Sequence, residues 1–328
     1  QNLKYEEQLA AKKVQVQDVF QRLGGFREIE VEPILGCEDI FSYRNKMEFT
    51  FANRRWLTED ETEDAQGDFA LGLHVPGRYD KILNINECHI QSKTANEIFD
   101  AVKQMCIDLE FDPYDIKAHN GFMRHLMIRH GRNTDEIMVN IVTSRDDSDR
   151  LKPIIHTLVE RFPEITSIVN NITARRAGVS TGEQQHVLYG KDTITEILGE
   201  YKYMISADSF FQTNTQQAER LYDIVKEEAA LTGNEIVYDL FCGTGSISIY
   251  VAKDAKMVYG FELVMSAVQD AMQNAVANGI KNTWFFAGDL MDLFQTNLEA
   301  KQLDDPDVMI VDPPRAGLHP RTIPDILK

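Results

Sequence analysis

Four short apolar runs, each followed by a stretch of helical length, fill the last third of the chain. They are EIVYDLFC, KMVYGFEL, NTWFFAGD and DVMIVDPP, which begin at Glu235, Lys256, Asn282 and Asp307. Strands that alternate with helices at this spacing are typical of a parallel, doubly wound sheet. We therefore expect a Rossmann-like α/β domain over residues 201–328, with a partial sheet because four strands are readable before the chain ends.

Residues 1–200 show a different hydrophobic pattern. Val16, Val19, Phe20 and Leu23 follow helical spacing ahead of Gly24-Gly25, which predicts an amphipathic helix near residues 4–23. NKMEFTF and FALGLHV alternate with period two, RHLMIRHGRNTDEIMVNIVT is typical of a hairpin that turns at 133–136, and TSIVNNI predicts a further strand. With helices near 93–110 and 149–162, residues 1–200 are expected to form an α+β domain of mostly antiparallel sheet.

Composition limits the class of protein. The 328 residues, 43% of them apolar, are enough for two domains with a buried core. No run approaches the roughly 18 apolar residues of a membrane span, and Gln1 opens neither a signal peptide nor an ordinary translation start, so we expect a cytoplasmic protein trimmed at its front. The net charge of −18 argues against nonspecific coating of nucleic acid, although part of the acid lies in an expected loop, EDETEDAQGD at 59–68.

The ends of the four expected strands carry the candidate ligand groups, because doubly wound sheets bind ligands at that edge. DLFCGTGSIS supplies a turn through Gly243 and Gly245, but Ser248 stands where a dinucleotide fingerprint needs a third glycine. Glu262 is placed to accept from the hydroxyls of a ribose, and Asp289 from an adenine amino group. Each feature alone is equally consistent with a helix cap or a structural turn. Together they favour S-adenosylmethionine over NAD.

Three segments carry a resemblance to a known family. DSFFQTNTQQAERLY, DLFCGTGSIS and DPPRAGLHP resemble the RNA uracil-5-methyltransferases, whose bacterial members make 5-methyluridine in 23S ribosomal RNA or transfer RNA, while YRNKMEF and LYG resemble the central domain of that family. The resemblance implies S-adenosylmethionine as cofactor and structured RNA, ribosomal RNA by preference, as partner. It places the cofactor contacts at Gln212, Phe241, Ser246, Glu262, Asp289 and Asp312. No obligate protein partner is evident.

The segment after the fourth strand raises a question of geometry. Pro313 and Pro314 fix φ and remove backbone donors, so they should end the strand and aim Asp312 at the transfer site. Arg315 is placed to balance that carboxylate or to contact the RNA backbone. The alternative is a prolyl strand exit with a surface ion pair.

Methylation at carbon 5 of uracil requires a thiolate that adds at carbon 6 and a base that removes the proton from carbon 5. The resemblance places that cysteine and that base beyond Lys328, so we expect no complete catalytic set in this chain and no methyl transfer by it. Cys242 is a substitute nucleophile by position, although we expect it to pack beneath the glycines of its turn.

The other cysteines have weaker assignments. Cys88 resembles the last ligand of a 4Fe-4S cluster whose other three cysteines lie upstream of Gln1 in the family, and an inert thiol is the alternative. Cys37 and Cys106 are expected in the core. No C-x-x-C pair is present, so reduced thiols are expected throughout.

RNA contact should come from local basic clusters, since the whole chain is acidic. The principal candidates are Arg44, Lys46, Arg124, Arg129 and Arg132, with Arg54, Arg55, His125, His130, Arg175 and Arg176 beside them in the sequence. For each of these residues, a solvated surface charge is an equally good interpretation. Two rival functions remain: methylation of another base atom, which Arg315 disfavours, and a non-catalytic RNA-binding module, which the retained Gln212, Glu262, Asp289 and Asp312 disfavour.

Overall fold

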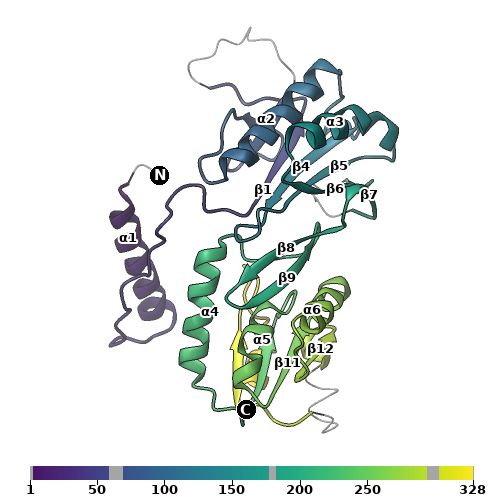
Figure 1. Ribbon diagram of the computed structural model, residues 1–328. Helices are drawn as coiled ribbons and strands as arrows, with labels where there is room; N and C mark the ends of the chain where they lie inside the picture. The colour runs from purple at the N-terminus through teal and green to yellow at the C-terminus, as the bar shows by residue number, and fades with distance from the viewer. Residues whose placement is uncertain (1–2, 59–68, 177–181, 294–302, 328) are drawn as a thin grey trace.

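The computed structural model describes residues 3–58, 69–176, 182–293 and 303–327, so the acidic segment at 59–68 lies outside the described residues. Two bodies are stacked, with a two-stranded hairpin between them and the first helix at one side (Figure 1). No helix in the described ranges is long and apolar enough to cross a membrane.

The first body is a seven-stranded sheet with two helices on one face. Its strands are β1 Lys46–Ala52, β2 Ala70–His74, β3 Ile82–Asn84, β4 Met123–His130, β5 Ile137–Thr143, β6 Ile165–Ile172 and β7 Gln184–Gly190, in the order β3-β2-β1-β4-β5-β6-β7. All neighbours are antiparallel except β5 and β6, which the crossover helix α3 Ser148–Arg161 connects. Phe49 of β1 packs on Phe99 of helix α2 Lys93–Asp108 with ring centroids 4.5 Å apart. The strands and helices expected here are confirmed.

The second body is a parallel sheet, as predicted. Its strands β10 Ile236–Leu240, β11 Met257–Glu262, β12 Thr283–Ala287 and β13 Val308–Val311 run in the order β12-β11-β10-β13, so the first strand lies inside the sheet. The helices are α4 Thr215–Ala229, α5 Ser246–Val251, α6 Met265–Ala277, α7 Leu290–Leu293 and α8 Ile323–Ile326, with the short 3₁₀ helix η2 Ala252–Asp254.

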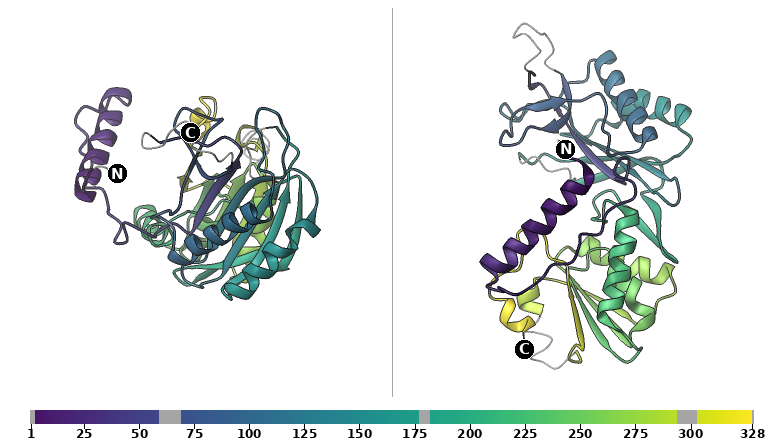
Figure 2. Two further views of the ribbon diagram at one scale, coloured as in Figure 1. Left: turned by 90° about the horizontal axis from the view of Figure 1, so that it is seen from above. Right: turned by 90° about the vertical axis from the view of Figure 1, so that its left-hand side faces the viewer.

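The first helix differs from its prediction in packing. Helix α1 Tyr5–Asp18 continues as the π-helical turn η1 Val19–Leu23 and ends before Gly24, as the sequence indicates. None of its described residues is buried, and Leu23 is 84% exposed. Figure 2 shows the helix standing apart from the two sheets. The apolar stripe of this helix therefore lacks the cover that its periodicity predicted.

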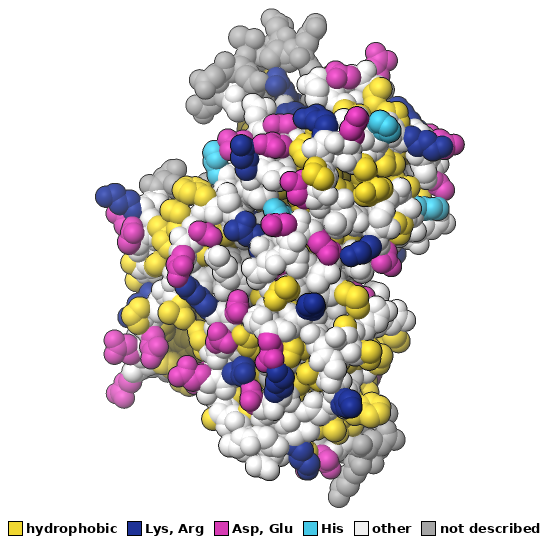
Figure 3. Space-filling model, viewed as in Figure 1, with side chains coloured by type: hydrophobic (Ala, Val, Ile, Leu, Met, Phe, Trp, Pro, Cys, Tyr) yellow, Lys and Arg dark blue, Asp and Glu magenta, His cyan; other side chains and the backbone are white. Residues whose placement is uncertain are grey.

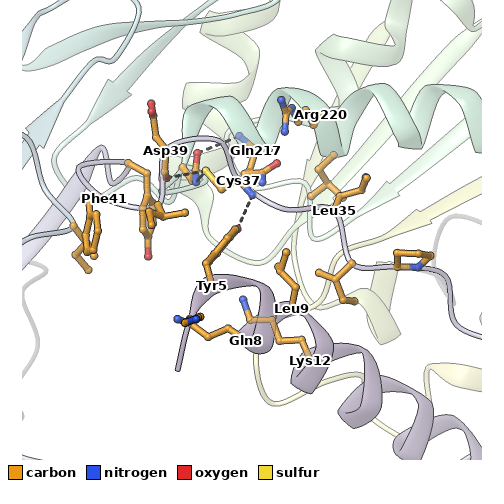
Figure 4. A pocket seen from close by; sticks show the side chains of 18 of the residues that line it. Tyr5, Gln8, Leu9, Lys12, Leu35, Cys37, Asp39, Phe41, Gln217 and Arg220 are labelled. Atoms are coloured by element: carbon orange, nitrogen blue, oxygen red, sulfur yellow. Dashed lines mark hydrogen bonds between the residues drawn. The ribbon is translucent and has the colours of Figure 1, made fainter. Parts of the chain in front are cut away.

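A groove of about 840 Å³ separates α1 from α4 (Figure 4). The Tyr5 hydroxyl accepts a hydrogen bond of 2.6 Å from the backbone N–H of Cys37, which ties the helix to the segment that follows it. Cys37 lines the groove and is partly exposed, so its expected place in the core was wrong. Cys106 is fully buried, as expected.

The hairpin of β8 Thr193–Leu198 and β9 Tyr201–Ser206 joins the two bodies and straddles residue 200. Glu196 of β8 is only 1% exposed. Its carboxylate accepts from the backbone N–H groups of Arg132 and Asn133, at 2.8 and 3.0 Å, and from the Thr215 hydroxyl at 2.7 Å. One buried carboxylate thus links the β4–β5 turn to the start of α4.

We expect Glu196→Gln to lower the free energy of unfolding by about 1–3 kcal/mol, because an amide nitrogen cannot accept from the N–H groups that the carboxylate satisfies. Urea unfolding followed by circular dichroism measures the change. Glu200→Gln is the matched control, because Glu200 lies in the same hairpin with an exposed side chain that pairs with Lys253. Equal stability of the two variants would remove Glu196 as the link.

Candidate functional site

The turn after β10 is strained in a way that opens one edge of the sheet. Phe241, Gly243 and Gly245 have φ of +66°, +54° and +74°, and the first of these is uncommon for a residue with a side chain. A Cβ on Gly245 would lie 2.9 Å from Ala271 and from the Phe285 ring, so only glycine lets the turn sit this close to α6. The backbone of the turn is therefore presented at the carboxyl ends of the strands.

Glu262 ends β11 and is held by that turn. Its two carboxylate oxygens accept from the backbone N–H of Gly243 at 3.1 Å and of Val264 at 2.9 Å. Each ionised oxygen keeps a further acceptor position. The carboxylate is thus fixed in place and still able to accept from the hydroxyl groups of a ligand.

A cavity of about 170 Å³ opens beside Glu262. Its lining combines aromatic rings, backbone and carboxylates: Phe241, Phe261, Glu262, Leu263, Gly288, Asp289, Leu290, Gly317, His319 and Thr322. Three of the predicted cofactor residues, Phe241, Glu262 and Asp289, therefore meet in one place. An apolar wall with two acceptor groups suits a nucleoside, which has a flat ring, ribose hydroxyls and an amino group.

A second pair of predicted residues meets within the second domain. The side-chain amide of Gln212 donates to Asp312 at 3.2 Å. Strand β13 ends at Val311, directly before Asp312 and the two prolines, as the sequence indicates. The side chain and backbone of Asn45, at the start of β1, donate to the carbonyls of Gln212 and Thr213, each at 2.8 Å. The first domain therefore holds part of the site of the second.

The remaining residues near this edge are arranged as follows. Ser246 begins α5, and its hydroxyl lies 2.8 Å from the Tyr222 hydroxyl. Arg315 is exposed, and no ion pair within 4 Å joins it to Asp312 in the described part of the chain. Phe210, two residues before Gln212, is 64% exposed. The sequence interpretation missed this exposed ring, for which an aromatic residue in a polar loop was the available signal.

Asp239 is the other residue that sequence reasoning passed over. It lies on β10 with no exposed surface, and the Ser248 hydroxyl donates to it at 2.5 Å. Burial, with smaller contributions from the nearby carboxylates Asp312 and Glu262, raises the pKa of Asp239 to about 7. Ser248, which stands where a dinucleotide turn has its third glycine, thus donates a hydrogen bond to this buried acid. An acid inside an apolar run was the signal in the sequence.

The two cysteines with candidate roles, Cys242 and Cys88, are both buried. Cys242 is buried beneath the turn, and burial together with Asp239 and Glu262 raises the pKa of its thiol well above the ordinary value. Cys88 is buried, and its N–H donates to Asn96. Among the described residues, no group of three or more His, Cys, Asp or Glu could hold a metal ion. These residues alone therefore do not fit an iron–sulfur cluster at Cys88.

The basic candidates divide into buried and exposed groups. Arg129 is 1% exposed and donates to the Ser209 carbonyl at 2.7 Å, while Arg124 is 2% exposed and stacks 4.1 Å from the Tyr114 ring. Their assignment to RNA contact is corrected, because other parts of the fold cover both side chains. The neighbouring His125 is also buried, which lowers its pKa to about 3.

The other basic candidates are more accessible. Burial lowers the pKa of Lys46 to about 8, Arg44 is half-buried, and Arg132 lies 3.7 Å from Asp39. Those with exposed side chains are Arg54, Arg175 and Arg176. On the face shown in Figure 3, Lys and Arg are interspersed with Asp and Glu and form no single patch.

Comparison with known proteins places this fold and site. A family model described as tRNA (uracil-5-)-methyltransferase matches residues 132–328. Proteins named RNA methyltransferases from Porphyromonas gingivalis and Chlorobaculum tepidum are 45% and 40% identical over 100% of the chain, which covers 72% and 69% of their lengths. The crystal structure of the Pyrococcus abyssi tRNA (uracil-54, C5)-methyltransferase with S-adenosyl-L-homocysteine has a TM-score of 0.75 at 28% identity, covering 99% of this chain and 71% of that one.

Together, the parallel sheet, its carboxylate-lined edge and these relatives define the class as RNA methyltransferase. The chain belongs to the tRNA (uracil-5-)-methyltransferase family. The resemblance stated from the sequence is therefore confirmed, as is the Rossmann-like fold.

Replacing Glu262 by Ala should weaken S-adenosylmethionine binding by about 1–3 kcal/mol, the range for leaving hydrogen-bonding groups unpaired. Titration calorimetry gives the dissociation constant directly. Glu228→Ala, an exposed glutamate of α4, is the control. An unchanged constant for the Glu262 variant would remove this carboxylate from the cofactor site.

Proposed function

We propose that this protein transfers a methyl group from S-adenosylmethionine to carbon 5 of a uracil in structured RNA. The observation that carries the proposal is the convergence of Phe241, Glu262 and Asp289 in one cavity, within a sequence that the uracil-5 family model matches over residues 132–328. The uracil-C5 specificity named for the Pyrococcus abyssi neighbour supports the choice of atom. We place the protein in the cytoplasm, where such RNA is available.

In this proposal the described residues hold the cofactor and border the approach of the target base. The cavity would hold the adenosine, with the ribose on Glu262 and the amino group near Asp289. The Gln212–Asp312 pair lies at the end of β13, where the rigid Pro313 fixes the backbone.

Addition at carbon 6 needs a thiolate, and Cys242 does not qualify because burial keeps its thiol protonated. The family resemblance places the nucleophilic cysteine and the general base beyond Lys328. We therefore propose that methyl transfer depends on those groups. The rival of a non-catalytic RNA-binding module predicts no cofactor binding, and methylation of another base atom predicts a different product.

The test of this proposal uses labelled S-adenosylmethionine and unmodified RNA, with this chain and a version extended at both termini compared side by side. We expect labelled 5-methyluridine from the extended version alone, identified by mass spectrometry of nucleosides. Label in a different nucleoside would favour the rival base atom. 5-Methyluridine made by the short chain alone would show that a thiol already present acts as nucleophile.

Ribosomal RNA is our proposed substrate, and its binding should depend on the exposed arginines of the first domain. The double change Arg175→Ala with Arg176→Ala should lower RNA affinity and reduce the salt slope by about one to two, because each phosphate contact releases counterions. The backbone carbonyl of Arg175 that receives Arg124 remains in this variant. Filter binding at several salt concentrations measures both quantities for ribosomal and transfer RNA fragments.

Lys256→Ala is the matched control, since Lys256 is exposed on the second domain. Cofactor affinity should stay the same in all variants. RNA binding that is independent of salt, or unaltered in the double variant, would contradict the assignment of RNA contact to this part of the first domain.

A further inference from the structure

Asp239 lies between the two carboxylates that end the neighbouring strands. Strand β10 pairs with β11 on one side and β13 on the other, and Leu240 is in register with both Phe261 and Val311. The next residues along those strands are Glu262 and Asp312. At roughly 3.3 Å per residue, Asp239 lies about two steps, or roughly 7 Å, below the level of these two acids.

The carboxyl group of Asp239 is only partly satisfied. Ser248 donates to this carboxyl group through its hydroxyl, at 2.5 Å, and through its backbone N–H. The second carboxyl oxygen, Oδ1, is buried without a hydrogen-bond partner among the described residues. A buried ionised carboxylate with a vacant acceptor is costly, whereas a neutral carboxylic acid is much less so.

His319 lines the cavity beside Glu262, while the described groups whose charges act on Asp239 are acids or weak acids. They are Glu262 of β11, Asp312 beyond β13, Tyr222 of α4 and Cys242 of the turn. Three carboxyl groups near one another disfavour one another's ionisation, and of the three only Asp239 is fully buried. Asp239 is the most deeply buried of the three, so protonation costs the least free energy at Asp239.

A cofactor that carries a positive charge changes this balance. The sulfonium of S-adenosylmethionine is a cation, whereas the thioether sulfur of S-adenosylhomocysteine is neutral. Resting on the proposed cofactor site, we propose that Asp239 is a charge-sensing residue: it keeps its proton in the free protein and with S-adenosylhomocysteine, and releases it to solvent when S-adenosylmethionine binds.

The proton balance follows from the charge at sulfur. Binding of the sulfonium moves one proton from Asp239 to water, and no covalent bond to Asp239 forms or breaks. When the methyl group leaves, the sulfur becomes neutral and Asp239 takes a proton back from water. The site then loses the charge pairing that favoured the methyl donor, so the spent cofactor is held less tightly than the fresh one.

The sign of the pH dependence is fixed by this linkage. Binding that releases a proton strengthens as pH rises and levels off above the pKa of the free site, which for Asp239 is about 7. The affinity for S-adenosylmethionine should therefore rise by about fivefold to tenfold between about pH 6 and pH 8. The affinity for S-adenosylhomocysteine should change much less over that range.

Titration calorimetry near neutral pH, in phosphate and in Tris, measures the protons released, because the two buffers have different ionisation enthalpies. We expect about half a proton per S-adenosylmethionine bound at pH 7 and almost none per S-adenosylhomocysteine. Asp239→Asn should bind S-adenosylmethionine without that release. Asp223→Asn is the matched control, since Asp223 is an acid of α4 that accepts from Tyr250 and lies outside the site. This control should keep the release.

Two further measurements test the inference if the Asp239→Asn variant fails to fold. The infrared C=O band of a protonated carboxyl should disappear when S-adenosylmethionine is added to the unaltered protein. Ser248→Ala removes the donor to Asp239 and should move the release to higher pH. Equal release with both ligands, release that persists in folded Asp239→Asn, or an unchanged infrared band would overturn the inference. Absence of S-adenosylmethionine binding altogether would instead refute the proposed cofactor site.

Discussion

Parallel pairing of β10 with both β11 and β13 is the constraint on which the rest of this structure depends. Because parallel strands end at the same edge, the pairing brings the ends of segments far apart in the sequence to one line, with Glu262 and Asp312 on either side of the β10 turn. The turn after β10 then needs its glycines, since a Cβ on Gly245 would collide with the covering helix. The parallel pairing and the glycine turn together are enough to form a cavity that suits a nucleoside.

The position of Gln212 depends on a different set of interactions, buried at the junction of the two bodies. Glu196 joins the β4–β5 turn to α4, and Asn45 holds the backbone of the Gln212 loop. Arg129, nearby in the fold, is also buried and donates to Ser209 in the segment leading to that loop. Buried polar groups of this kind add little net stability, but they fix one relative arrangement of the parts they join.

Much of the fold could be predicted because its signals are local. Period-two alternation and helical spacing are properties of neighbouring residues, so the parallel sheet and many other strands and helices followed from the sequence, whereas β3, β7, β8 and β9 were not expected. Glu262 and Asp289, which meet in the cavity beside the β10 turn, could be named because a single topological rule places strand ends together, whereas Phe241 was named from the family resemblance. What could not be predicted depended on contacts between distant segments. Period-two alternation identified β4, but it does not tell that other parts of the chain cover Arg124 and Arg129 on that strand.

The hairpin that joins the two bodies makes them unsuitable for separation. Leu198 and Tyr201 are paired across its tip. The buried Glu196 carboxylate of the same hairpin accepts hydrogen bonds from Asn133 of the first body and Thr215 of the second. A fragment that begins after residue 200 would carry β9 without its partner and the Gln212 loop without Asn45. Neither half could be exchanged for another domain without rebuilding this junction, so a change in one body at this junction requires a matching change in the other.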